Sequence, residues 1–240
     1  MKQRLDRLLV ERGLAESREK AQALVLAGAV FVDGARAAKP GQNAASEAEI
    51  RVAARPAHVS RAGPKLEAAL EHFGIRVTDR VCLDIGASTG GFTDCLLQHG
   101  ARRVYAVDVG SGQLDWKLRN DPRVAVRERL NARYLRPEDI GEQPGLVTCD
   151  VSFISVTLIL PAVAALLQPD GEMVILVKPQ FEAGKGMVGK GGIVREPELH
   201  RAACGRVEDA VRALGFNSAV IECPIRGAEG NKEFLLHARH

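Results

Sequence analysis

Four charged residues stand beside strongly apolar segments of the chain: Lys65, Asp150, Lys178 and Glu233. Three of them flank predicted strands, and the first opens a predicted helix. Two amines and two carboxylates can move a proton and orient a substrate, but lysine acts as a base only when it is neutral. Its ordinary pKa is ~10.4, and burial or a second ammonium group lowers it. Taken singly, each charge is more often a satisfied structural group than a catalyst.

A glycine-rich loop follows the first long apolar strand. The strand-type run Val81–Ile85 leads at once into Gly86–Gly91 and then into a helical pattern. This is the first unit of a doubly wound α/β domain, and its glycines let backbone approach a ligand. An acidic residue ends the next strand, where such side chains bind ribose hydroxyls. The candidate cofactor-binding residues are Asp84, Gly86, Ser88, Gly90, Gly91, Phe92, Asp108 and Asn131.

The loop departs from the dinucleotide pattern G-x-G-x-x-G, because Ser88 stands where that pattern has its middle glycine. A nicotinamide or flavin dinucleotide brings its pyrophosphate close to the backbone there. S-adenosylmethionine has no pyrophosphate, so the loop suits it better, and a nicotinamide dehydrogenase is the weakest interpretation. An α/β domain with a tight turn and no cofactor is the structural alternative.

The remaining apolar runs predict one α/β sheet. Strands are predicted at 124–126, 146–149 and 173–177, followed by an antiparallel pair at 219–223 and 233–237. The carboxyl ends of parallel strands are where α/β proteins bind ligands. Four polar residues lie at such ends: Asp84, Asp108, Asp150 and Lys178.

The first quarter of the chain is a small basic module. Residues 1–62 carry 11 Lys and Arg against seven Asp and Glu, and the rest is close to neutral. Apolar spacing predicts a helix around Leu5–Leu9, a second helix capped by Ser17, a strand at 29–32 and an Asp33-Gly34 turn. A basic module suits a polyanionic partner, although charge alone is more simply explained as a solvated surface.

Three segments of this module, taken in order, resemble the RNA-binding domain named after ribosomal protein S-four. They are Arg4-Leu5-Asp6, Ala15-x-Ser17-Arg18 and Gly28-x-Val30-x-Val32-Asp33-Gly34. That domain presents basic residues to structured RNA, which is recognised through shape and phosphates. The resemblance implies RNA-binding roles for Arg4, Arg7, Arg18 and Lys20.

Composition excludes several other classes of protein. Hydrophobic residues make up 46% and charged residues 26% of the 240, which excludes disorder, collagen and coiled coil. The five cysteines form no C-x-x-C pair, which argues against a zinc site or a disulfide framework and favours a reducing cytoplasm. The longest uncharged run, 151–169, is better explained as a strand end and a core helix than as a membrane span.

The whole chain resembles the TlyA family, in which an S-four-like module precedes an FtsJ-like methyltransferase domain. The matching motifs are Gly86-x-Ser88-x-Gly90-Gly91-Phe92-Thr93-Asp94, Asp150-x-Ser152-Phe153-Ile154-Ser155, Val177-Lys178-Pro179-Gln180-Phe181-Glu182 and Gly230-Asn231-x-Glu233-Phe234. A departure is Ala62-Gly63-Pro64, where a second glycine and no proline are expected. The resemblance implies an S-four-like domain at 1–55, a linker at 56–62 and a Rossmann-like methyltransferase domain at 63–240. We also expect the glycine-rich stretch 184–192 to be a mobile loop.

The resemblance further implies S-adenosylmethionine-dependent 2′-O-methylation of cytidine in ribosomal RNA, of the large subunit or of both subunits. In the FtsJ-like tetrad, Lys178 would be the base, Lys65 its like-charge neighbour, and Asp150 and Glu233 the orienting groups. The sulfonium carries its own leaving group, so no metal is required. The expected partners are ribosomal RNA or ribosomal subunits, without a membrane.

Two alternatives remain open at this point. A non-catalytic RNA-binding or ribosome-assembly factor would keep the basic module and bind no methyl donor. A membrane-active haemolysin, an activity historically attached to the family, lacks support from a long apolar span or a basic amphipathic helix.

Overall fold

The structure is a computed structural model that describes residues 2–26, 28–52, 58–184, 189–227 and 230–240. It divides into two compact units, Met1–Ala57 and His58–His240. The predicted linker at 56–62 is described only from His58 onward, and His58 is a buried residue of the second unit. Of the predicted mobile loop 184–192, residues 185–188 lie outside the described part.

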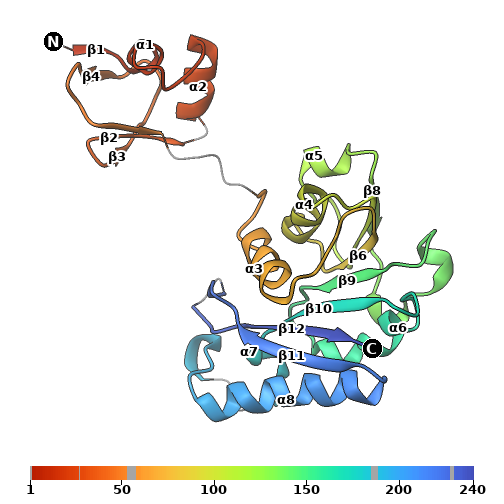
Figure 1. Cartoon of the computed structure of the whole chain (residues 1–240). Coiled ribbons are helices and arrows are strands. Elements are labelled where there is room, and N and C mark those ends of the chain that lie inside the picture. Colours follow the sequence, from red (N-terminus) through yellow and green to blue (C-terminus); the bar gives the residue numbers. More distant parts are fainter. Residues whose placement is uncertain (1, 27, 53–57, 185–188, 228–229) are drawn as a thin grey trace. The chain divides into compact units, whose positions relative to one another are not determined.

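The first unit combines two helices with short antiparallel strands (Figure 1). β1 pairs with β4, and β2 pairs with both β3 and β5. Both helices and β2 confirm the sequence prediction, whereas β1, β4 and β5 are too short to show a period. The elements are β1 (Lys2–Arg4), α1 (Leu5–Glu11), α2 (Arg18–Leu26), β2 (Val30–Val32), β3 (Ala35–Arg36), β4 (Asn43–Ala45) and β5 (Ile50–Val52).

Local signals in the sequence explain these boundaries. The Ser17 hydroxyl accepts a hydrogen bond from the backbone N–H of Lys20 at 3.2 Å, as an N-cap should. Asp33 and Gly34 have φ of 49° and 79°, which is the twist that a two-residue hairpin turn needs. Leu5, Leu9 and residues packed around them form a hydrophobic core that belongs to this unit alone.

The second unit is built on a seven-stranded sheet of order β11-β12-β10-β9-β6-β7-β8. Five neighbouring strands run parallel, and β12 is antiparallel to both β10 and β11 (Figure 1). Every strand predicted for this region is present, the final antiparallel pair included. The strands are β6 (Val81–Ile85), β7 (Arg103–Asp108), β8 (Val124–Glu128), β9 (Leu146–Cys149), β10 (Glu172–Val177), β11 (Asn217–Glu222) and β12 (Phe234–Arg239).

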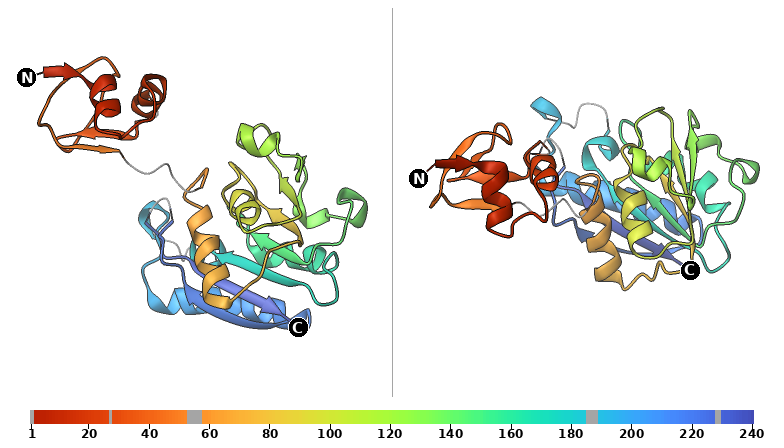
Figure 2. Two further views of the ribbon diagram at one scale, coloured as in Figure 1. Left: turned by 45° about the horizontal axis from the view of Figure 1, so that its top comes forward. Right: turned by 90° about the horizontal axis from the view of Figure 1, so that it is seen from above.

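Helices cover both faces of this sheet, as Figure 2 shows. Side chains alternate along each strand, so Leu83 packs in the core beneath α6 and α8 while Cys82 packs beneath α3, α4 and α5. This confirms the predicted doubly wound α/β architecture. The α-helices are α3 (Gly63–Phe73), α4 (Gly91–Gln98), α5 (Trp116–Arg119), α6 (Leu160–Ala164), α7 (Pro179–Glu182) and α8 (Pro197–Ala213). The 3-10 helices are η1 (Ala132–Tyr134), η2 (Pro137–Asp139), η3 (Val156–Leu158) and η4 (Lys190–Gly192).

Within the described ranges, we find no helix with both the length and the apolar character needed to cross a bilayer.

Candidate active site

The four charged residues singled out in the sequence line one cavity of about 620 Å³. β9 and β10 are parallel neighbours, so Asp150 and Lys178, which follow them, leave the sheet at the same edge. β12 runs the other way and starts opposite the end of β10, with Phe234 paired to Val177. Glu233 therefore enters the sheet at that edge, and Lys65 reaches it from the first turn of α3.

Two ion pairs organise these side chains. Lys178 Nζ lies 2.5 Å from Asp150 Oδ1 and donates a hydrogen bond to Ser152 Oγ at 2.9 Å. Lys65 Nζ donates to Glu233 Oε2 at 2.5 Å. From the sequence we expected Lys65 to be a like-charge neighbour of Lys178. Both lysines line this cavity, and each ammonium group has a carboxylate partner of its own, so the site contains two ion pairs.

The segment before Lys65 accommodates its departure from the family pattern. Pro64 lies in the first turn of α3, where the missing N–H of proline costs no hydrogen bond. Gly63 is required there, because a Cβ at this position would lie 2.3 Å from Cγ of His58. The unexpected Pro64 thus lies, directly after Gly63, at the beginning of the helix that carries Lys65 into the cavity.

A second cavity, of about 560 Å³, adjoins the first and lies over the glycine-rich loop. Four residues line both cavities: Ser88, Asp150, Ser152 and Phe153. Much of the wall of the second cavity is apolar, with Val107, Leu130 and Ile159 among its residues. Its size and its mixture of apolar and polar walls are typical of a site for a small organic ligand.

Gly86 joins the loop to the segment that carries Asp150. Its φ is +82°, and a Cβ there would lie 2.3 Å from the carbonyl oxygen of Asp150. The backbone N–H of Asp150 donates to the carbonyl of Ile85 at 2.9 Å. Only glycine permits this close approach. The approach fixes the position of Asp150, which lines both cavities, relative to the glycine-rich loop.

Asp108 lies at the end of β7 and lines the second cavity, as the sequence analysis expected of a ribose-binding residue. Its Oδ2 accepts from the backbone N–H of Ser88 at 2.8 Å, and its Oδ1 accepts from that of Gly110 at 2.7 Å. Each carboxylate oxygen can accept a further hydrogen bond. Asp108 therefore both shapes the loop and remains able to bind hydroxyl groups.

The other predicted cofactor-binding residues take several positions. Gly86, Ser88 and Asn131 line the second cavity, while Gly91 and Phe92 line a small recess of about 100 Å³ next to it. Gly90 serves packing instead, since a Cβ there would lie 2.2 Å from Cδ1 of Leu118.

Asp84 is the clearest departure from the sequence analysis, because it lies beneath the loop and not on a cavity wall. It is fully buried, and its carboxylate accepts from the hydroxyls of Thr93 at 2.7 Å and Thr148 at 2.9 Å. Burial raises the pKa of Asp84 to about 6. Side chains alternate along a strand, so Asp84 points toward the face of the sheet that α4 covers. Its hydrogen bond with Thr93 fixes the position of α4 on the sheet.

An exposed aromatic residue, Phe153, lines both cavities, and no role was predicted for it. Phe153 is 92% exposed and has a φ of +65°, a conformation that a bulky residue rarely adopts. Its ring lies 5.3 Å from the ring of Phe181, centroid to centroid. Such an outlier marks a position that the surrounding structure holds in place. The signal was present in the sequence, since both residues belong to motifs of the family resemblance.

Two buried residues without an assigned role hold the loops around the cavities. Glu182, 3% exposed, accepts from the Ser155 hydroxyl at 2.5 Å and from the Val156 N–H at 2.8 Å. Asn231 accepts from the Val194 N–H at 2.9 Å. Their motifs, like that of Phe153, were visible in the sequence, but their contacts were not.

The basic residues of the first unit are organised by a buried carboxylate. Asp6 is fully buried and accepts from Arg4 Nη2 and from Arg18 Nε, each at 2.9 Å. The hydrogen bond from Arg4 holds the pKa of Asp6 far below its ordinary range. Arg7 is exposed on α1, and Lys20 forms a surface ion pair with Glu16.

Comparison with known proteins agrees with these two units. A family model described as FtsJ-like methyltransferase matches residues 58–240, and the S4 domain model matches residues 3–50.

Individual relatives cover almost the whole chain. The 16S/23S rRNA (cytidine-2′-O)-methyltransferase TlyA of Mycobacterium tuberculosis is 48% identical over 98% of this chain and 89% of its own. Hemolysin A of Brachyspira hyodysenteriae is 46% identical over 98% of both chains. A solved structure from Streptococcus thermophilus, named for the hemolysins, has a TM-score of 0.76 at 46% identity and covers 99% of this chain and 88% of that chain.

These matches span both units and include the strands and loops that form the two cavities. The chain therefore belongs to the FtsJ-like methyltransferase family, and its S4 domain and its relatives place it in the TlyA group of that family.

Proposed function

We propose that this protein transfers a methyl group from S-adenosylmethionine to the 2′-oxygen of a cytidine ribose in ribosomal RNA. The observation that carries the proposal is the pair of adjoining cavities, one over the glycine-rich loop and one lined by the two ion pairs. They meet at Asp150, so a methyl donor in the cavity over the glycine-rich loop would lie next to a hydroxyl group in the lysine-lined cavity. The curated TlyA relative supports the choice of reaction.

The residues of the second cavity fit S-adenosylmethionine. Asp108 can bind the ribose hydroxyls, and Leu130 and Ile159 provide an apolar surface for adenine. Gly86 lets the loop pass against the carbonyl of Asp150, where a Cβ would clash, and so keeps this cavity next to the lysine-lined one. When bound, the sulfonium supplies an electrophilic methyl group and a neutral leaving group.

The ion pairs can hold the nucleophile and receive its proton. Lys178 Nζ is the candidate proton acceptor, and an ammonium group must first lose a proton before it can accept one. Asp150 Oδ1, 2.5 Å from Nζ, and the Ser152 hydroxyl hold that group at the cavity wall. The Lys65–Glu233 pair lines the other wall and orients the ribose. Holding the hydroxyl in line with the methyl group accounts for a large part of the expected rate enhancement.

Phe153 provides a platform for the base of the target nucleotide. Sequence-selective proteins stack single-stranded bases on exposed aromatic rings. The ring of Phe153 is exposed, lines both cavities and is backed by Phe181. A ribose in the lysine-lined cavity could therefore place its base against this ring.

The S4 domain would supply affinity for folded RNA. Asp6 holds the guanidinium groups of Arg4 and Arg18 in one arrangement while leaving 45% and 48% of their side-chain surfaces exposed. Preordered arginines lose little conformational entropy when they bind phosphates. This role, and a cytoplasmic location shared with the ribosome, are parts of the same proposal.

The decisive experiment maps 2′-O-methyl groups on ribosomal RNA after incubation with S-adenosylmethionine and either wild-type protein or Lys178→Ala. We expect a new 2′-O-methylcytidine with the wild type alone. Tight RNA binding without cofactor binding or methyl transfer would instead support the non-catalytic assembly factor. A second candidate function is membrane lysis, because the Brachyspira relative is named Hemolysin A. Leakage of liposomes caused by the purified protein would support that function.

A further inference from the structure

A third cavity, of about 350 Å³, lies beside the lysine-lined cavity and shares Arg226 with it. Three of its lining residues are cationic, and within the described residues no carboxylate lines it. Its wall comes from the segment before α8, from α8 itself and from the segment before β12. The lining residues are Ile193, Val194, Arg195, His200, Arg226, Gly230 and Lys232.

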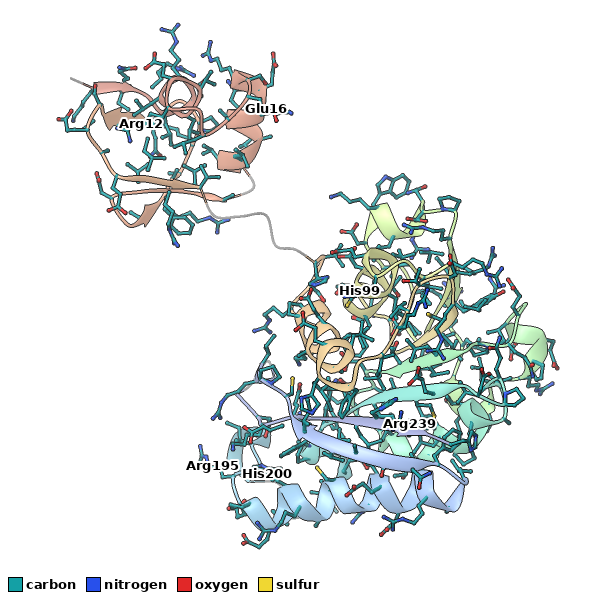
Figure 3. The ribbon with its side chains drawn as sticks, viewed as in Figure 1. Arg12, Glu16, His99, Arg195, His200 and Arg239 are labelled. Atoms are coloured by element: carbon teal, nitrogen blue, oxygen red, sulfur yellow. The ribbon has the colours of Figure 1, made fainter. Side chains whose placement is uncertain are left out.

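Buried side chains hold this wall in place. The N–H of Val194 donates to Oδ1 of Asn231 at 2.9 Å, and the carbonyl of Val194 lies 3.0 Å from Nε2 of His200. Because a carbonyl only accepts, Nε2 of His200 carries the proton in this contact. Asn231 and His200 are 1% and 8% exposed. Arg195 thus follows Val194, whose backbone N–H and carbonyl are both hydrogen-bonded. Figure 3 shows the side chain of Arg195 next to His200.

The cations around this cavity are available to a ligand. Among the described residues, the guanidinium of Arg195 has no carboxylate partner, and Arg226 donates only to the carbonyl of Gly230 at 3.2 Å. Lys232 pairs with Glu222 at 2.9 Å, and the two side chains are 38% and 51% exposed. An exposed pair of this kind is weak and can exchange partners. Glu196, beside Arg195, accepts from the backbone N–H of Arg195 at 3.2 Å and does not line the cavity.

We propose that this third cavity binds a backbone phosphate of the substrate RNA next to the nucleotide that is methylated. Guanidinium groups bind phosphate oxygens in a two-point geometry, and an ammonium group adds a point charge. A ribose in the lysine-lined cavity carries a phosphate on each side, and Arg226 lies where the two cavities meet. The inference rests on the proposed function and adds to it a subsite outside the S4 domain.

The test compares wild type, Arg195→Ala and Lys232→Ala in full-length protein, with large-subunit ribosomal RNA as the probe at several salt concentrations. Loss of one phosphate contact makes the slope of log K, the association constant, against log salt less steep by about 0.7 to 0.9. This corresponds to about a fourfold to fivefold loss of affinity at 0.15 M salt. Arg195→Lys should recover part of this loss. S-adenosylmethionine affinity should not change in any of these variants.

The matched control is Arg212→Ala, which removes an exposed cation at the other end of α8, where it pairs with Asp209. It should bind RNA as wild type does. Equal affinities and salt slopes for Arg195→Ala, Lys232→Ala and Arg212→Ala would overturn the subsite. Failure of the wild type to bind or methylate the RNA would instead overturn the proposed function, so the two failures can be told apart.

Discussion

Each lysine of the candidate site lies 2.5 Å from one carboxylate, but the two pairs differ in burial. The side chain of Glu233 is 3% exposed and that of its partner Lys65 is 10% exposed. Asp150 retains more contact with the cavity, at 16% exposed. We therefore expect the Lys65–Glu233 pair to contribute more to stability, and the proposed proton acceptor remains Lys178.

Replacement of Lys178 with alanine should reduce kcat for methyl transfer by about a hundredfold or more, the usual contribution of a positioned acid or base. Dissociation constants for S-adenosylmethionine and RNA should change little. Single-turnover methyl transfer and equilibrium binding measure these quantities separately. Full activity of this variant, with RNA binding intact, would show that another group accepts the proton.

Removal of the Glu233 carboxylate should destabilise the fold, because it leaves the ammonium group of Lys65 buried without its partner. We expect Glu233→Ala to lower the free energy of unfolding by about 3 kcal/mol, as measured by urea denaturation. The double variant Lys65→Met/Glu233→Leu should recover most of that stability yet remain inactive in methyl transfer. Recovery of activity together with stability would mean that the pair is only structural.

The buried carboxylate of Asp84 predicts a specific dependence of stability on pH. Its pKa is about 6 in the folded protein against an ordinary value of 3.8, so the folded state binds the proton more tightly. Stability should therefore fall as the pH rises from about 4 to about 6, by about 3 kcal/mol, and then level off.

Asp84→Asn should remove this pH-dependent loss, because its amide can still form hydrogen bonds with the hydroxyls of Thr93 and Thr148. Urea denaturation of both proteins between pH 4 and pH 7.5 isolates the contribution of this residue. Identical slopes for wild type and variant would contradict the assignment.

At the scale of elements, the unit formed by β6, the glycine-rich loop and α4 connects the two cavities. The loop must turn within a few residues while passing under the segment after β9. Gly86 makes that passage possible, and Asp84 braces the start of α4 through Thr93.

Gly86→Ala tests this unit against a matched glycine. Gly86 and Gly112 both have positive φ, at +82° and +72°, but a Cβ at Gly112 would meet no atom within 4 Å. Gly112→Ala should therefore cost only the backbone strain, about 1–2 kcal/mol. Gly86→Ala should cost more and also weaken S-adenosylmethionine binding at least tenfold. Denaturation and calorimetric titration provide both values, and equal effects of the two variants would argue against the close approach.

At the scale of the whole molecule, each unit has a hydrophobic core of its own. Units with separate cores generally unfold separately. The full chain should show two transitions in scanning calorimetry, and S-adenosylmethionine should raise the midpoint of only one of them. Assignment of the shifted transition to residues 58–240 can be made by hydrogen exchange. A single transition that shifts as a whole would show that the units fold together.

Sequence by itself determined most of the elements and the identity of the chemical groups. Apolar runs with a strand or helix period predicted β6 to β12 in the second unit and both helices of the first. Turn residues such as Asp33-Gly34 encode a local backbone geometry, so they could be interpreted without neighbours. The four residues of the site could be named because each stands beside such a run and because together they resemble the FtsJ-like tetrad.

Tertiary structure alone decided how those groups are used. Lys65 and Glu233 are 168 residues apart, and no local pattern states that they pair with each other and leave Lys178 to Asp150. The burial of Asp84, the exposure of Phe153 and the cationic cavity around Arg195 likewise depend on which surfaces pack together. The physical reason is that periodicity and turn chemistry act over a few residues, whereas distances between side chains follow from the packing of whole layers.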